Sequence, residues 1–243
     1  MKLRLTALAA LFCAASPAWA GPSEYIYTPI VEQGEREVDL KFGMIDHPGS
    51  GTKAQTSLGF GYGATSWWFT EFYGKWNHTA AAGTRFDALE WENKFQLTET
   101  GKYPVDLGFL LEIERPKNRS EGYEFRYGPL LQTELDKVQL NLNLLLARFV
   151  KTDNPQVTEL SYQWQAKYRW QPALELGVQG LGTLGRWDHW SARDAQSHKV
   201  GPALFGKIGL GERQAIRYNV GWLIGTSKAA PDNTLRTQIE YEF

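Results

Sequence analysis

The sequence predicts an all-β fold, an antiparallel up-and-down transmembrane β-barrel of twelve strands. Apolar and polar residues alternate with a period of two over long segments, as expected when successive side chains of a strand point to opposite faces. The chain holds 10 Trp, 11 Tyr and 12 Phe but is 22% charged. After residue 20 it has no apolar run near the 18 residues that a membrane-spanning helix needs. Long alternating strands in an aromatic, polar chain are typical of a barrel with one lipid-facing and one lumen-facing side.

Each predicted strand has one apolar and one polar face. In residues 138–150, for example, Leu140 and Leu142 alternate with Gln139 and Asn141. The twelve segments are Glu37–Ile45, Ala54–Ala64, Trp67–Asn77, Arg85–Thr98, Val105–Ile113, Tyr123–Leu135, Val138–Val150, Leu160–Trp170, Leu174–Leu184, Val200–Leu210, Ile216–Ile224 and Leu235–Phe243. Trp67–Asn77 is the least regular of them, because aromatic residues also lie on its polar face. An even number of strands suits a single-chain bacterial barrel.

A soluble β-sandwich also alternates, and two features count against it. Sandwich strands are typically about 5–6 residues long, whereas these segments are about twice that length. Several apolar faces also end in aromatic residues, such as Trp68 and Trp76, or Tyr162 and Trp170. Such a distribution fits the aromatic girdles at the two membrane interfaces.

The first twenty residues predict a cleaved export signal. Lys2 and Arg4 precede an apolar stretch over residues 5–15, and Ala18-Trp19-Ala20 fits a cleavage site that leaves Gly21 first. A membrane anchor is the alternative, but the apolar stretch is too short to span a bilayer.

Cys13 could suggest a lipoprotein signal, which we discount because Phe12 stands where a small residue is expected. Without residues 1–20 the chain has no cysteine, so no disulfide or thiol chemistry is expected. Removal of Lys2 and Arg4 leaves 24 basic against 27 acidic residues, a net charge of −3, which argues against nucleic acid as a partner.

The lengths of the connections predict both termini on the periplasmic side. We expect short turns near residues 65–66, 101, 136–137, 171–172 and 212–213, and longer external loops over residues 46–53, 78–83, 116–121, 151–155, 187–199 and 227–233. Residues 21–35 are expected to form a short periplasmic segment, and residues 36–243 the barrel.

The chain ends Gln-Ile-Glu-Tyr-Glu-Phe, with Ile239, Tyr241 and Phe243 at alternate positions. Together with the predicted signal, this ending resembles the assembly signal of bacterial outer-membrane β-barrel proteins. The resemblance implies a location in the bacterial outer membrane, contact with its lipids, and recognition of the last strand by the insertion machinery. It implies no particular function or oligomeric state.

No Gly-rich phosphate loop, cysteine metal site or G-x-S-x-G elbow is present, and we assign no catalytic residue or cofactor. All four histidines, His47, His78, His189 and His198, are expected in external loops, where they are weak candidates for a metal site. Asp-His pairs at residues 46–47 and 188–189 superficially suit an omptin-like protease. Such barrels have ten strands, however, and twelve are predicted.

The predicted lumen is rich in charge, and acids outnumber bases. The inward acids are Glu37, Asp39, Glu71, Glu90, Glu92, Asp106, Glu112, Glu114, Glu124, Glu134, Glu159, Glu175, Glu240 and Glu242. The inward bases are Lys41, Lys75, Lys94, Arg126, Lys167, Arg169, Lys207, Arg217 and Arg236. Buried charges require water or partners.

Two functions are therefore open. A hydrated lumen would form a channel for small hydrophilic solutes with a weak cation preference, set by Glu90, Glu92, Glu112 and Glu114. Charges that pair across the lumen would instead close the barrel, leaving a structural or loop-mediated binding role.

Overall fold

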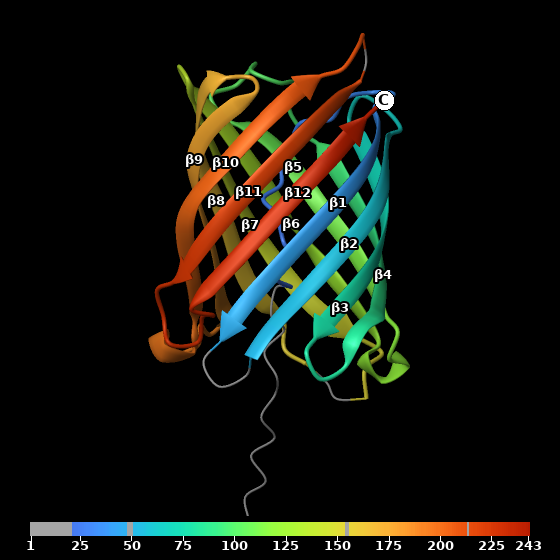
Figure 1. Ribbon diagram of the computed structural model, residues 1–243, viewed down its shortest axis with the longest axis vertical. Helices are drawn as coiled ribbons and strands as arrows, with labels where there is room; N and C mark the ends of the chain where they lie inside the picture. The colour runs from blue at the N-terminus through green and yellow to red at the C-terminus, as the bar shows by residue number, and fades with distance from the viewer. Residues whose placement is uncertain (1–20, 48–50, 154–155, 213) are drawn as a thin grey trace, which may run out of the picture.

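The chain forms a closed antiparallel β-barrel (Figure 1). The computed structural model describes residues 21–47, 51–153, 156–212 and 214–243, and within these residues it contains twelve strands. The strands are β1 (Arg36–His47), β2 (Gly51–Gly63), β3 (Trp68–Thr79), β4 (Gly83–Gln96), β5 (Asp106–Pro116), β6 (Tyr123–Leu135), β7 (Val138–Val150), β8 (Glu159–Gln171), β9 (Leu174–Arg186), β10 (Ser197–Gly209), β11 (Ala215–Gly225) and β12 (Asn233–Glu242). Two short 3-10 turns, η1 (Arg119–Glu121) and η2 (Arg193–Ala195), lie in the connections. The predicted strand number and fold are confirmed.

The barrel closes by pairing of its first and last strands. The β1–β12 register runs from Glu37 opposite Glu242 to Asp46 opposite Asn233. Beyond it, the Phe243 N–H donates to the Arg36 carbonyl oxygen at 2.9 Å. Closure leaves no free sheet edge, so the strand backbone can be hydrogen-bonded within hydrocarbon.

Apolar side chains lie outside the barrel and polar ones inside it. Leu58 and Phe60 are 48% and 52% exposed, whereas Asp39 and Glu71 are each 1% exposed. A soluble sandwich would bury the opposite set, so the alternating pattern describes a transmembrane barrel. No helix in the described part of the chain is long and apolar enough to cross a membrane.

The predicted difference between short and long connections holds only in part. We call the end that holds the C-terminus and the start of β1 the turn end, and the opposite end the loop end. At the turn end, residues 136–137 form a tight hairpin in which Asp136 adopts a φ of 54°, a conformation that Asp tolerates. The β4–β5 connection over residues 97–105 is longer than expected. At the loop end only residues 80–82 join β3 to β4, because both strands continue past their predicted ends.

Residues 21–31 lie inside the barrel, where Figure 1 shows a dark blue trace behind the front strands, and residues 32–34 are exposed at its turn end. Ile26, Tyr27 and Val31 are 6%, 5% and 8% exposed. Tyr27 packs in a small apolar cluster with three inward leucines, Leu110, Leu130 and Leu145. The sequence placed this segment on the periplasmic side of the barrel, and nothing in its pattern indicated entry into the lumen. The expected signal over residues 1–20 falls outside the described residues.

Candidate functional site: the occupied lumen

One side of the lumen is lined by ion pairs, and we call it the charged wall. It comprises Asp39, Lys41, Glu71, Lys75, Glu90, Glu92, Glu112, Glu114, Glu124 and Arg126, from β1 and β3–β6. These residues lie on the inward face because alternate positions of each strand point into the barrel. Lys75 Nζ lies 2.9 Å from Glu90 and also contacts Glu114.

Arg126 pairs with three carboxylates. Its guanidinium lies 3.3 Å from Glu112, 3.2 Å from Glu124 and 2.9 Å from Glu24 of the N-terminal segment. All four side chains are at most 13% exposed. In a medium of low dielectric constant, one base stabilises the charged form of each acidic neighbour. Arg126 therefore stabilises the charges of three carboxylates at once.

Lys41, on β1, is the basic partner of two neighbouring acids. Its Nζ lies 3.6 Å from Asp39 and 3.8 Å from Glu92, which belongs to β4. The same Nζ lies 3.6 Å and 3.7 Å from the ring centres of Tyr25 and Tyr73, within the range of cation–π attraction. The carboxylates expected to give the lumen a negative stretch therefore have basic partners.

The N-terminal segment binds the charged wall through side-chain contacts. Tyr25 donates its hydroxyl to Glu92 at 2.9 Å, and Tyr27 donates to Glu112. At its turn-end side, the Val31 N–H donates to Gln96 at 2.8 Å. Hydrogen bonds to carboxylates are stronger than those between neutral groups. The segment is thus held as an integral part of the lumen.

The facing side of the lumen is lined by amides, and we call it the amide wall. Its members are Gln132, Gln139, Asn141, Asn143, Gln163, Gln165 and Gln179, from β6–β9. Gln165 donates to Asn141 at 3.0 Å and accepts from Gln179 at 3.1 Å, while the side-chain amides of Asn143 and Gln163 lie 3.1 Å apart. Their polar character and inward parity follow from the sequence, but their linkage into a network depends on the barrel register.

The other predicted lumen residues lie toward the turn end, except Arg236, which pairs with Gly43 nearer the loop end. Lys167 pairs with Glu175 at 3.0 Å, and Arg169 with Glu134 at 2.6 Å. The remaining four have different surroundings. Arg217 pairs with Glu242, Lys94 lies 4.9 Å from the Phe69 ring, and Glu240 accepts a hydrogen bond from Gln238 at 2.6 Å. Arg236 is 3% exposed on β12.

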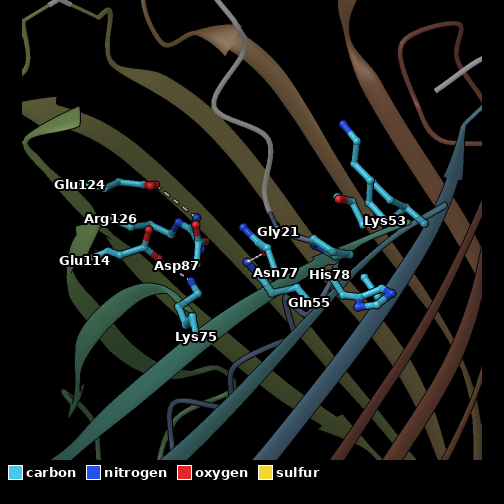
Figure 2. Close-up of a pocket in the computed structure, with 14 residues that line it drawn as sticks. Gly21, Lys53, Gln55, Lys75, Asn77, His78, Asp87, Glu114, Glu124 and Arg126 are labelled. Atoms are coloured by element: carbon cyan, nitrogen blue, oxygen red, sulfur yellow. Dashed lines mark hydrogen bonds and ion pairs between the residues drawn. The ribbon is translucent and has the colours of Figure 1, made fainter. Parts of the chain in front are cut away.

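Within the described part of the lumen, cavities lie on both sides of the segment. A cavity of about 450 Å³ at the loop end is lined by residues that include Lys53, Asp87, Glu114, Glu124 and Arg126, as Figure 2 shows. We call it the vestibule. A smaller cavity of about 120 Å³ lies between the segment and the turn-end part of the lumen, beside residues that include Tyr25, Ile30, Lys94 and Glu240. Residues 21–31 thus lie between the vestibule and the turn end.

The structure does not gather the histidines in loops. His78 lies within β3 and His198 within β10, because both strands run further than predicted, and His47 is the last residue of β1. His78 contacts Thr84 at 2.9 Å, and His198 contacts Tyr162 at 2.8 Å. Only His189 occupies a loop, between β9 and η2. The predicted loop location is therefore wrong for the other three.

A group of three carboxylates lies on the charged wall instead. Ligand oxygens of Glu90, Glu92 and Glu112 lie within 4.8 Å of one another, the one such group of His, Cys, Asp or Glu found among the described residues. Their partners are Lys75, Tyr25 and Lys41, and Arg126 and Tyr27 respectively. Each carboxylate thus has a basic neighbour in the protein, although Glu92 Oε2 accepts no hydrogen bond from the described residues, and we assign no metal to this group.

No protein-family model and no curated protein matches the sequence. Among solved structures, the barrel is similar to the COG4313 outer membrane channel from Pseudomonas putida F1, with a TM-score of 0.58 and 14% identity over 92% of this chain and 99% of that one. It is similar to the KdgM porin in complex with disordered oligogalacturonate, with a TM-score of 0.55 and 9% identity over 85% and 98%. It also resembles the translocator domain of the autotransporter NalP from Neisseria meningitidis, with a TM-score of 0.53 and 11% identity over 87% and 88%. Structural similarity at such low sequence identity establishes the shared fold alone, and function has to be argued from the residues of the lumen.

Proposed function

We propose that this chain is a channel of the bacterial outer membrane for small hydrophilic solutes, and that residues 21–35 hold it closed in the arrangement described above. The observation that carries the proposal is the polar lumen, which contains a vestibule and a second cavity while the outer face of the barrel is apolar. Water-filled, charge-lined interiors are how barrels of this class pass solutes. The outer membrane channel and the porin among the similar structures support the proposal of a channel.

Conduction requires the N-terminal segment to move. Its contacts with Glu92, Glu112 and Arg126 are hydrogen bonds and one ion pair, and no disulfide can form because residues 21–243 lack cysteine. The barrel wall is continuous, and the segment is held in the lumen by non-covalent contacts. Displacement of the segment is therefore the simplest way to open a path from the vestibule to the turn end.

Planar bilayer recording tests the channel. Purified protein should give discrete conductance steps, and a Tyr25→Phe/Tyr27→Phe variant, which loses both hydroxyl anchors, should open more often. Tyr218→Phe is a matched control, because the Tyr218 hydroxyl donates to the Ala173 carbonyl oxygen in the β8–β9 connection and not to the charged wall. A folded, inserted double variant that never conducts would contradict the proposal.

We further propose a weak cation preference, since inward acids exceed inward bases. The pairing described above reduces the preference that Glu90, Glu92, Glu112 and Glu114 would otherwise give. Their joint change to Gln should move the reversal potential toward anions. Glu99→Gln/Asp194→Asn is the control, because both carboxylates are exposed outside the lumen. An unchanged reversal potential in an open quadruple variant would place the selective region elsewhere.

The occupied lumen also favours a second candidate function, a non-conducting barrel with a structural or loop-mediated binding role. Many lumen charges are paired, and Tyr27 is packed against three leucines, as a permanently filled interior would be. The bilayer recordings above decide between the two candidates. Neither assigns a catalytic residue.

We propose that Ile239, Tyr241 and Phe243 serve as the assembly signal read by the insertion machinery. Ile239 and Phe243 are 43% and 40% exposed on the outer face, and the Tyr241 and Phe243 rings stack 5.6 Å apart. Exposed side chains of a terminal strand are open to recognition before closure. Deleting Phe243 should sharply lower the amount of heat-modifiable protein in outer-membrane fractions, whereas Leu210→Ala, which removes another exposed apolar side chain, should not. Equal recovery of both would count against the assembly role.

A further inference from the structure

Glu24 is ion-paired with Arg126 and lies within electrostatic range of two further inward bases, Lys199 and Arg236. Its Oε1 lies 2.9 Å from Arg126 Nη1, with the two side chains 11% and 13% exposed. Glu24 also acts electrostatically on Lys199 of β10 and Arg236 of β12. β12 pairs with β1 of the charged wall and β10 lies two strands further round the barrel, so the three bases come from different parts of the lumen.

Arg236 has an unmet need for an anion. It is 3% exposed, and its Nη1 has no hydrogen-bond partner. In the described part of the chain, no carboxylate lies within ion-pair distance of Arg236 or Lys199, although each base repels the other. A buried charge without a partner is costly, and a buried like-charge pair is costlier. Glu24 is the acid whose charge favours both bases, but it contacts neither of them and is ion-paired with Arg126.

Two glycines allow this arrangement. A Cβ on Gly221 would lie 3.3 Å from Arg236 Cγ, so its absence leaves room for the arginine stem. A Cβ on Gly43, the β1 partner of Arg236, would clash with the Pro22 backbone. The segment can therefore pass close to β1 beside Arg236. The turn from Gly21 to Glu24, closed by a 3.1 Å backbone hydrogen bond, then positions the carboxylate.

We propose that Arg126, Lys199 and Arg236 form a binding site for the carboxylate of a small organic acid, and that Glu24 occupies this site while the segment is in place. The inference rests on the proposed channel and names a solute class for it. Arg126 lines the vestibule, so a solute that enters from the loop end reaches this member of the site without crossing the segment. Guanidinium groups recognise carboxylates through paired N–H donors. A site for an anion is compatible with a weak cation preference, because the preference depends on all charges of the pore whereas the site consists of three side chains.

Replacement of Glu24 by a free carboxylate tests the site. Glu24→Ala leaves a space of suitable size, so sodium acetate should raise the midpoint of heat-modifiable unfolding in detergent by about 2–4 °C, saturably. Acetamide, its neutral isostere, and sodium chloride at equal ionic strength should not. If Glu24→Ala fails to assemble, refolding it with acetate should restore the yield and refolding with acetamide should not.

Two further variants separate a specific site from general salt effects. Glu32→Ala is the matched control, because Glu32 lies on the same segment but contacts Arg217 at 3.6 Å; acetate should leave it unchanged. Glu24→Ala/Arg236→Gln should lose the acetate response. The site is overturned if Glu24→Ala shows no saturable response, or if the double variant keeps it. This assay needs no conduction, so the site and the channel can fail independently.

Discussion

The charged wall and the amide wall are both buried and polar, yet they are stabilised differently. On the charged wall, Lys75 and Arg126 each hold several carboxylates. On the amide wall, neutral groups share hydrogen bonds in a network, as Gln165 does with Asn141 and Gln179. Loss of one partner leaves an uncompensated charge on the first wall and an unpaired dipole on the second. The barrel therefore concentrates electrostatic energy on the wall that binds the N-terminal segment.

The largest expected effect is that of Arg126→Met. The change leaves Glu24, Glu112 and Glu124 without their common base, so the free energy of unfolding should fall by about 3–5 kcal/mol. Urea unfolding followed by heat-modifiable migration would measure it. A loss below about 1 kcal/mol would mean that solvent already screens this wall.

Tyr27→Phe tests how much the segment gains from the charged wall. Loss of a hydroxyl that donates to a carboxylate should cost about 1.5–3 kcal/mol. The same unfolding assay applies, with Tyr218→Phe as the control for a tyrosine at the turn end. If both variants lose the same small amount of unfolding free energy, the Tyr27 hydrogen bond does not hold the segment on the charged wall.

Gln165→Met tests the amide wall. Asn141 Oδ1 and Gln179 Nε2 would each lose a partner, and the expected loss of unfolding free energy is about 1–3 kcal/mol. A matched Gln196→Met, in the connection before β10, should change little, since Gln196 is only partly buried. If Gln165→Met costs as much as Arg126→Met, the contrast between the walls is wrong.

The smallest effect is expected at Glu35, where the segment enters β1. Burial raises the pKa of this carboxyl above its ordinary value of 4.5, although Lys94 and Arg217 oppose the shift. A raised pKa means that the folded state binds the proton more tightly, so wild-type stability falls as pH rises through the interval between the unfolded and folded values. Glu35→Gln should lack this fall. Parallel stability–pH curves for the two proteins between pH 4 and 7 would contradict the assignment.

The period-two pattern determined the strands and their faces. Each strand was predicted to within a few residues, and residues such as Asp39, Glu71 and Gln163 were placed on the polar face because alternation is a local property of the chain. The same locality explains the errors. Strand ends near His78 and His198 lie in polar sequence, where alternation no longer separates a strand from a loop.

Sequence by itself thus determined the number of strands, the inward and outward sets, and the excess of inward acids. Only the tertiary structure decided which charges pair, that the amides form a network, and that residues 21–31 occupy the lumen. Pairing such as Lys41 with Glu92 joins β1 to β4 across the lumen and depends on closure and register. The segment has no repeating pattern of its own. Its place is set by complementarity, with Glu24 near bases and Tyr25 and Tyr27 against carboxylates, which exists only once the barrel has closed.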